Sequence, residues 1–398
     1  MQRIATLTLT SFAILTTAAS CTLPGLDFGS RNDGQILGVL KRDPSISSAF
    51  GKINSVKLLD NTSNPQGLTT VPTLKIEQIS SDEFYLLTRT KGLFYTDSGG
   101  KQWSRKYIFP VTPNNQQTQT QLIQNDSLIG TELKIDSNNP KVLFYAGIQN
   151  DIGKIYRSVN GGKNFDEVYS AVDTNTSIIS IAIDPNNNAN VFGLLNQGTL
   201  IRSQDSGQSW SKMRDFNDQA IQLGFVPEFD NLFYILLRSK GLWLSPDEGE
   251  TWSEQKLTRT KSTIGETQGS RLNFSNKSQD VERFSKFESI VPIKADKDNW
   301  LIIADKQLWL GESLNQPFNK LVFPLPDERF DFAGLAADPQ KGKSRILASI
   351  DNQLFETKNQ GQSWSTSTQP GLANDIGNIS SITLDKNNSE IIYLTILE

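Results

Sequence analysis

The chain has 398 residues, and its 39 basic and 43 acidic side chains give a net charge of −4, a near balance that disfavours a general nucleic-acid-binding protein. It contains no histidine and one cysteine, Cys21, so the commonest general base is missing and neither an intrachain disulfide nor a cysteine-based zinc site can form. We therefore expect no metal site and no cofactor. Length alone predicts about two or three domains, a number that internal repeats reduce to one.

Residues 1–21 have the pattern of an export signal, because Arg3 precedes an apolar stretch and small residues lead to Cys21. The cysteine at this place resembles the bacterial lipobox, although Ala18 stands where that motif usually has leucine. The resemblance implies a lipid on Cys21 that anchors an exported protein to the outer face of the cytoplasmic membrane or to the outer membrane. Residues 22–34 would then form a flexible tether. A plain secretory signal with a chance cysteine is the alternative.

A short motif with the pattern S/T-x-D/N-x-G-x-x-W/F recurs along the chain. Copies begin at Thr96, Ser158, Ser203, Ser245 and Thr357, and a degraded copy spans residues 311–318. Asp or Asn caps a turn, Gly takes the positive φ that the turn needs, and the aromatic residue packs between neighbouring sheets. The first copy departs from the pattern, because Ser98 replaces the Asp or Asn. The structural residues of the motif are expected to be Trp103, Asn160, Phe165, Asp205, Gly207, Trp210, Asp247, Gly249, Trp252, Asn359, Gly361 and Trp364.

An apolar strand precedes each copy, and a second pattern of strand, Asx-rich turn and strand recurs further upstream, for example at residues 181–192. Each unit therefore has four short strands, called A to D from here on. The copies that begin at Ser158, Ser203 and Ser245 are 45 and 42 residues apart. Four-stranded units at this period predict a β-propeller. Complete units, or blades, are expected at residues 72–109, 131–172, 178–217, 219–257, 287–324 and 331–369.

The two ends of the chain are expected to complete one more blade. Residues 379–398 supply only strands A and B, whereas residues 38–42 match strand C and residues 55–59 can form strand D. This pairing would close the ring and remove open sheet edges. The sequence thus predicts an all-β fold, a single seven-bladed propeller of four-stranded antiparallel blades over residues 35–398, whose last blade is completed by both termini. Insertion loops are expected at residues 110–130 and 258–285.

The recurring motif resembles the Asp-box, or BNR repeat, of sialidases, sortilin-like receptors, xyloglucan-type glycosidases and photosystem II stability/assembly factor-like proteins. The resemblance covers nearly all of residues 35–398. The blade count and the tight blades favour the photosystem II stability/assembly factor-like group, whose members are seven-bladed. This resemblance implies a lipid-anchored or exported scaffold.

Candidate catalytic residues are scarce. A sialidase needs an arginine triad and a tyrosine nucleophile, but the F/Y-R-I-P signature is absent and residues 291–294 are the nearest match. A glycosidase needs two carboxylates at a defined spacing. The repeated acidic residues sit in predicted turns, where capping explains them: Asp136, Asp184, Asp338 and Asp385. We therefore expect a non-catalytic monomer that binds a protein partner as a scaffold or assembly factor. A sialidase-like glycoside hydrolase and a carbohydrate-binding propeller are the alternatives.

The topology predicts which face of the ring binds the partner. The A–B and C–D turns share one face, so the B–C turns and the D–A connections, which include both long insertions, share the other. Basic residues gather on this second face: Arg89, Lys91, Arg238, Lys240, Arg259, Lys261, Arg271 and Lys306. A positive rim would attract an acidic protein loop, an anionic glycan or lipid headgroups. The alternative is that these side chains are ordinary solvated turn charges.

Overall fold

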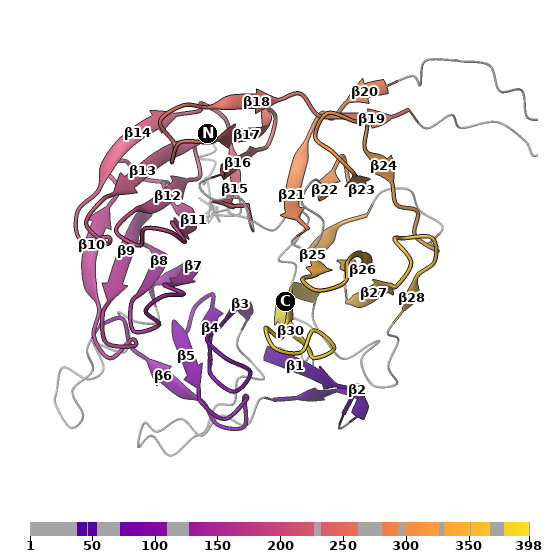
Figure 1. Ribbon diagram of the computed structural model, residues 1–398. Coiled ribbons are helices and arrows are strands. Elements are labelled where there is room, and N and C mark those ends of the chain that lie inside the picture. Colours follow the sequence, from indigo (N-terminus) through magenta and orange to yellow (C-terminus); the bar gives the residue numbers. More distant parts are fainter. Residues whose placement is uncertain are drawn as a thin grey trace, which may run out of the picture.

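The computed structural model describes residues 38–45, 47–53, 72–109, 127–226, 232–261, 281–293, 299–325, 330–350, 352–366 and 378–397. The predicted signal, Cys21 and the tether lie outside the described residues. Seven four-stranded antiparallel sheets are arranged around a centre (Figure 1), so the predicted seven-bladed propeller is confirmed. Within the described part of the chain, no helix has the length and apolarity needed to cross a membrane.

Six blades take their four strands consecutively from the chain. The first three consist of β3 (Thr73–Gln78), β4 (Phe84–Thr88), β5 (Leu93–Thr96) and β6 (Ser104–Lys106); β7 (Ile129–Ile135), β8 (Leu143–Gln149), β9 (Ile152–Ser158) and β10 (Asp166–Ser170); and β11 (Ile178–Ile183), β12 (Val191–Leu195), β13 (Thr199–Ser203) and β14 (Ser211–Asp215). The next three consist of β15 (Ala220–Phe225), β16 (Phe233–Leu237), β17 (Gly241–Ser245) and β18 (Ser253–Gln255); β21 (Phe287–Pro292), β22 (Trp300–Ala304), β23 (Gln307–Gly311) and β24 (Asn319–Lys320); and β25 (Phe332–Asp338), β26 (Gly342–Ile350), β27 (Gln353–Thr357) and β28 (Ser365–Thr366).

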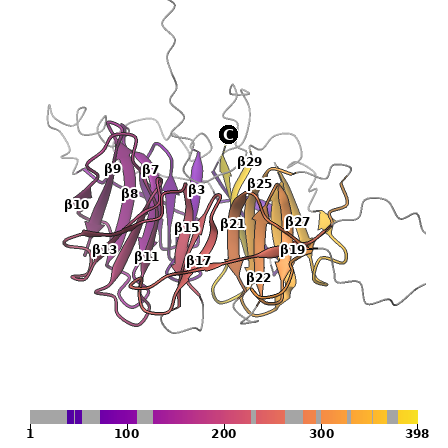
Figure 2. The ribbon, with the colours of Figure 1, turned by 90° about the horizontal axis from the view of Figure 1, so that it is seen from above.

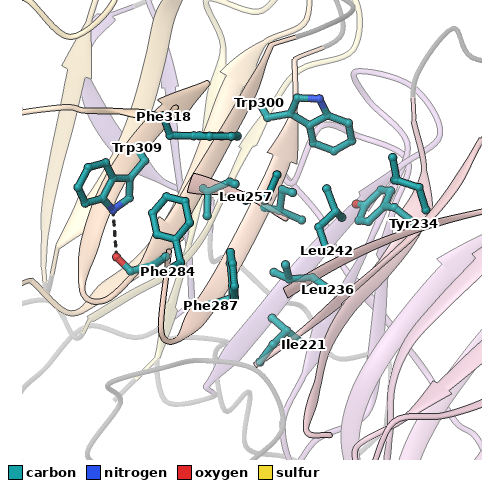
Figure 3. Close-up of a cluster of buried hydrophobic side chains, with 14 of the residues drawn as sticks. Ile221, Tyr234, Leu236, Leu242, Leu257, Phe284, Phe287, Trp300, Trp309 and Phe318 are labelled. Atoms are coloured by element: carbon teal, nitrogen blue, oxygen red, sulfur yellow. Dashed lines mark hydrogen bonds between the residues drawn. The ribbon is translucent and has the colours of Figure 1, made fainter. Parts of the chain in front are cut away.

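The B strands form the hydrophobic layers between blades. Every residue of β4, β12, β16 and β22 is buried, because a blade in the ring is covered on both faces by its neighbours. Figure 3 shows one such layer, in which side chains of blades 4 and 5 pack around Trp300 and Phe287. Trp309 is also fully enclosed there, and its indole N–H donates to the carbonyl of Ala304 at 3.1 Å. The polar atom of this buried indole is thus satisfied within its own blade.

Each A strand carries a β-bulge near its start, after the first or second paired residue, where one extra residue interrupts the register with strand B. The bulged residues are Leu74, Thr131, Ile179, Ile221, Glu288, Ala333 and Ser380. A bulge bends the strand and redirects the side chains that follow. Lys75, Glu132, Ser180 and Gln222 therefore occupy equivalent positions in blades 1 to 4, and all of them line the central cavity.

Both termini build the seventh blade. Its strands are β29 (Asn378–Leu384), β30 (Ile392–Leu397), β1 (Gly38–Asp43) and β2 (Ser47–Lys52), in the order β2-β1-β30-β29. The prediction that residues 55–59 form strand D was wrong, because β2 takes that place and residues 54–60 lie outside the described residues. A tight turn explains the difference: the carboxylate of Asp43 accepts hydrogen bonds from the amide and hydroxyl of Ser45, so the chain reverses at once.

Contacts from both neighbouring blades hold the N-terminal strands in place. On the side of blade 1, the indole N–H of Trp103 donates to the carbonyl of Ile53 at 2.8 Å. On the side of blade 6, the guanidinium of Arg42 donates to Glu356 at 3.0 Å. These two contacts join residues that are 50 and 314 positions apart in the chain, so β1 and β2 belong to the ring rather than to the tether.

The insertion at residues 258–285 does not form a simple loop. Its ends are the strands β19 (Thr258–Thr260) and β20 (Val281–Arg283), which pair with each other. Strand β19 also extends blade 5, because the amide of Thr260 donates to the carbonyl of Phe318 at 3.0 Å and the amide of Phe318 donates to the carbonyl of Thr258 at 2.8 Å. Residues 262–280, and residues 110–126 of the other insertion, lie outside the described residues.

A buried ion network joins blades 6 and 7. The side chain of Arg345 is 1% exposed and contacts Asp338 at 2.9 Å and Glu356 at 2.8 Å. It also donates to the carbonyl of Ser389 in blade 7 at 2.6 Å. Burial would raise the pKa of Asp338 and of Glu356, but hydrogen bonds from Arg345 outweigh it, so both pKa values lie below their usual range.

We predict that Arg345→Met destabilises the protein by about 3–5 kcal/mol at pH 7, because Asp338 then stays buried without a cationic partner and Glu356 keeps only Arg42. In the native protein, a lowered pKa adds stability that is complete above the unfolded pKa of about 4 and is lost as the pH falls through the folded pKa. In the variant, burial would raise both carboxyl pKa values, so its deficit shrinks towards pH 4. Urea unfolding at pH 7, 5 and 4 measures this. Lys212→Met, which removes a half-exposed lysine, is the control, and a deficit independent of pH would contradict the prediction.

Candidate functional site

The ring has two faces with different turns (Figure 2). One face carries the A–B turns and the Asp-box turns between strands C and D, and the other carries the B–C turns and the D–A connections. The structure places Arg89, Lys91, Arg238, Lys240 and Lys306 in B–C turns, and Arg259 and Lys261 in the insertion after blade 4. These seven basic residues therefore share the second face, called the B–C face from here on. Arg271 lies outside the described residues.

The Asp-boxes are clasps made of local hydrogen bonds. In each of the five copies the first Ser or Thr hydroxyl accepts from the amide of the box glycine, for example Ser203 from Gly207 at 2.7 Å. The third residue caps the turn: Asn160, Asp205, Asp247 and Asn359 each accept from the backbone four positions later at 2.8–3.0 Å. In the first copy the hydroxyl of Ser98 takes over this role, accepting from the amide of Gln102 at 3.0 Å.

The closing aromatic residues pack inward and complete the clasps. The indole N–H groups of Trp210 and Trp252 donate to the carbonyls of Gly207 and Gly249 at 3.2 and 2.8 Å. Trp364 stacks on Phe323 with ring centroids 4.3 Å apart, and Phe165 and Trp103 are buried. Hydrogen bonds from Ser209 hold the pKa of Asp205 well below its usual range, and Thr251 does the same for Asp247. Both carboxylates are thus turn caps that stay ionised.

The repeated acidic residues of the A–B turns are also caps. Asp136, Asp184, Asp338 and Asp385 are all buried, and each accepts from the backbone amides two and three positions later. Such a carboxylate is committed to its turn. These aspartates are therefore not a catalytic set.

We predict that Gly207→Ala destabilises the ring more than Gly161→Ala does. Both glycines have positive φ, at 84° and 67°, so the conformational cost is of the same kind in both variants. A Cβ at Gly207 would overlap the ring of Phe144, whereas at Gly161 the nearest atom is the Tyr85 hydroxyl at 3.5 Å. The additional loss should be about 1–3 kcal/mol. Thermal unfolding of the two variants measures the difference, and equal melting temperatures would contradict it.

Most basic residues of the B–C face are engaged within the molecule. Arg259 lies 3.1 Å from both Glu282 and Asp305 and rests over the rings of Phe284 and Trp309. The ammonium of Lys306 pairs with Asp331 at 2.8 Å, and that of Lys240 donates to the carbonyl of Phe216 at 2.6 Å. Acidic side chains thus neutralise much of the predicted positive rim.

Arg238 differs from these residues. Its guanidinium makes no hydrogen bond or ion pair with any described residue, and its Nε is buried without a partner. The backbone around it is fixed, because the amide of Arg238 donates to Gln219 and its carbonyl accepts from Phe287, both at 2.8 Å. An arginine held in place with unused donors suits bidentate binding of a carboxylate.

Glu288 is a residue of this face that the sequence analysis missed. It takes the bulge position of β21, it is 4% exposed, and no described residue gives its carboxylate a hydrogen bond. Burial raises its pKa, and the positive charges of Lys286, Arg238 and Lys306 offset this only in part. A comparison of the repeats could have identified Glu288, because the residues at the bulge positions of the other blades are apolar or carry a hydroxyl group.

Among the described residues that line the central cavity, the two glutamates are bridged by a lysine. Glu77 and Glu132 both face the cavity, and the ammonium of Lys75 bridges them at 2.7 and 2.6 Å. Burial would raise the pKa of Glu77, but Lys75 and Lys134 hold it below its usual range. Tyr234 hydrogen-bonds Gln222 rather than a glutamate, and burial raises its pKa to about 12. No cluster of three or more metal-ligating side chains occurs among the described residues.

The fold and the clasps define this chain as a seven-bladed Asp-box β-propeller. The family model of sortilin, neurotensin receptor 3 (Sortilin-Vps10), matches residues 198–307. No curated protein matches the sequence significantly. The predicted resemblance to sortilin-like, xyloglucan-type and assembly-factor propellers is confirmed by this match and by solved structures of the same fold.

Three solved structures illustrate this similarity. A GH74 xyloglucanase from Xanthomonas campestris has a TM-score of 0.61 at 14% identity, with 82% of this chain and 51% of that chain covered. YCF48 from Cyanidioschyzon merolae has a TM-score of 0.55 at 11% identity, with 82% and 96% covered. YCF48 bound to D1 peptide has a TM-score of 0.54 at 13% identity, with 83% and 94% covered. The chain thus spans about half the length of the xyloglucanase and of a second GH74 enzyme, from Niastella koreensis. At these identities the likeness shows the fold alone.

Proposed function

We propose that this propeller is a non-catalytic, lipid-anchored extracytoplasmic protein that binds an acidic segment of another protein through its B–C face. The observation that carries the proposal is Arg238, a half-buried residue whose backbone is fixed by two hydrogen bonds and whose guanidinium has no partner among the described residues. Arginine in such a setting is a frequent hot spot of protein interfaces, because unpaired buried donors gain most from a carboxylate. Lys261, which is exposed at the base of the insertion, adds a second positive charge.

The comparison with YCF48 supports a role in protein binding. The match with this chain covers 94% of that propeller, whose structure has been solved bound to D1 peptide. The bridged carboxylates of the cavity support the absence of catalysis, since Glu77 and Glu132 already share Lys75. Turnover of any member of a glycan panel by the purified protein would overturn this part of the proposal, and glycan binding without turnover would favour a carbohydrate-binding propeller.

We predict that the double substitution Arg238→Glu and Lys261→Glu reduces capture of the protein partner from a membrane extract at least about tenfold, because like charges then face its acidic segment. The salt dependence of the remaining capture should also weaken. Arg259 is left intact, because its ion pairs and ring contacts make it part of the blade packing.

The matched control reverses two lysines on the opposite face, Lys101→Glu and Lys163→Glu, which are both exposed in Asp-box turns. Partner capture is quantified by mass spectrometry at several salt concentrations. Equal capture by the wild type and by the B–C face variant would remove the proposed interface, and so would an equal loss in the control.

We predict that Cys21→Ala abolishes membrane attachment, because the thiol is the site to which the diacylglycerol would be joined. Attachment through buried acyl chains gains about 0.8 kcal/mol per methylene, so the wild type should partition into the detergent phase and the variant into the aqueous phase. Phase partitioning followed by immunoblotting measures this. A variant that still enters the detergent phase would exclude Cys21 as the anchor.

A further inference from the structure

The chain enters the ring on the B–C face. The first described strand, β1, is the C strand of blade 7, and its first residue, Gly38, pairs with Ile396 near the end of the B strand β30. The other end of β1 leads into the turn at Asp43, which is the C–D turn of this blade. Because antiparallel neighbours run in opposite directions, Gly38 lies on the face that carries the B–C turns, which is also the face of Arg238.

The ring itself fixes this point of entry. Val39 and Leu40, which follow Gly38, are 0% and 1% exposed. The amide of Ile53 donates to the carbonyl of Val39 at 3.2 Å. Any anchor that precedes residue 38 is therefore joined to the molecule at one place, on the B–C face.

A short segment separates this point of entry from the predicted lipid-bearing cysteine. Cys21 is joined to Gly38 by the 16 residues 22–37. They span at most about 58 Å when extended, and about 20–24 Å as a coil. The A strands have six or seven residues, so a blade is about 20–23 Å high. A coil of this length brings the B–C face down to a membrane, whereas the opposite orientation makes it run back over the height of a blade.

We propose that the anchored ring turns its B–C face towards the membrane, and that the acidic segment it binds belongs to a protein held at the same membrane. This inference rests on the proposed function, because it takes Cys21 as the anchor and Arg238 as the binding residue. It places the partner's acidic segment within about 58 Å of the lipid surface. The anchor then strengthens capture, since a ring held at the membrane meets its partner at a raised effective concentration.

A protein segment suits this face better than lipid headgroups do. Attraction to an anionic surface grows with each basic residue that is not neutralised, but Arg259 and Lys306 are paired with acids and Lys240 donates to a backbone carbonyl. Arg238 is half-buried and has no hydrogen-bond partner among the described residues, which suits one well-placed carboxylate. The orientation therefore depends on the point of entry at Gly38 and not on the charge of the face.

The first test measures how far each face lies from the membrane. Cys21 is the sole cysteine and would carry the lipid, so one added cysteine can be labelled with a donor fluorophore. Gln197→Cys in the B–C turn of blade 3 and Gln208→Cys in its Asp-box turn are a matched pair, because both glutamines are exposed and lie on the same blade. The lipidated protein is placed on phosphatidylcholine vesicles that contain an acceptor-labelled lipid. We expect stronger energy transfer from position 197, since the two faces are about 20 Å apart.

Equal transfer from the two positions, or stronger transfer from position 208, would overturn the orientation and leave the proposed binding by Arg238 intact. A difference that arises only after phosphatidylglycerol is added would also overturn it, because headgroup attraction would then orient the ring. Arg238→Glu combined with Lys261→Glu should leave the energy transfer unchanged, which separates the orientation from the proposed interface. Protein that does not stay on the vesicles would overturn both the anchor and this inference.

The second test locates the partner. From intact membranes, the wild type should capture at least about tenfold more partner than Cys21→Ala, because only the wild type is concentrated at the membrane. After solubilisation in detergent, the two proteins should capture equal amounts. Equal capture from intact membranes would overturn the proposed location of the partner. A deficit of Cys21→Ala that persists in detergent would overturn it as well, since the loss would then not come from the anchor.

Discussion

The antiparallel pairing of β1 with β30 is the interaction on which the rest of the structure depends. It joins residues 38–42 to residues 392–396 and turns an open row of blades into a ring. Without it, the outer half of blade 7 is missing and the edge of β30 is exposed, which is the arrangement that favours aggregation. Arg42 and Ile53 fasten the same strands to blades 6 and 1, so the closure is secured on both sides.

Every blade has the same backbone conformation. Side chains that could bind a ligand occur where the sequence departs from the repeat. Asp-boxes and Asx turns satisfy their own backbone groups, so they leave little polar capacity for a ligand. Glu288 occupies a bulge position that is apolar or hydroxylated in the other blades. At the equivalent cavity-lining positions of blades 1 to 4, Lys75 and Glu132 are charged, whereas Ser180 and Gln222 are neutral. These non-repeated side chains are therefore the candidates for contacts with a ligand or a partner protein.

Ion pairs within the protein reduce the positive charge of the B–C face. A count of basic residues gives a broad positive rim, but Arg259 and Lys306 are neutralised by acids that come from other segments. Two groups stand out from this compensation: the guanidinium of Arg238, whose positive charge acts on the buried carboxyl of Glu288, and the exposed ammonium of Lys261. Recognition at such a site depends on placing one carboxylate well rather than on long-range attraction.

The sequence alone determined the features that arise from neighbouring residues. The blades, the clasp at Asp205 and the caps at Asp136 and Asp385 follow from motifs a few residues long, whose hydrogen bonds close within the same turn. Sequence repetition also predicted that the termini share a blade. The tertiary structure alone decided which strand completes that blade, and it showed that Arg345 joins two blades and that Arg259 is paired. These outcomes depend on partners far away in the chain, such as Arg42 and Glu356 across 314 positions. Local propensity carries no information about which distant side chain will meet a given charge, because that is set by the closure of the ring.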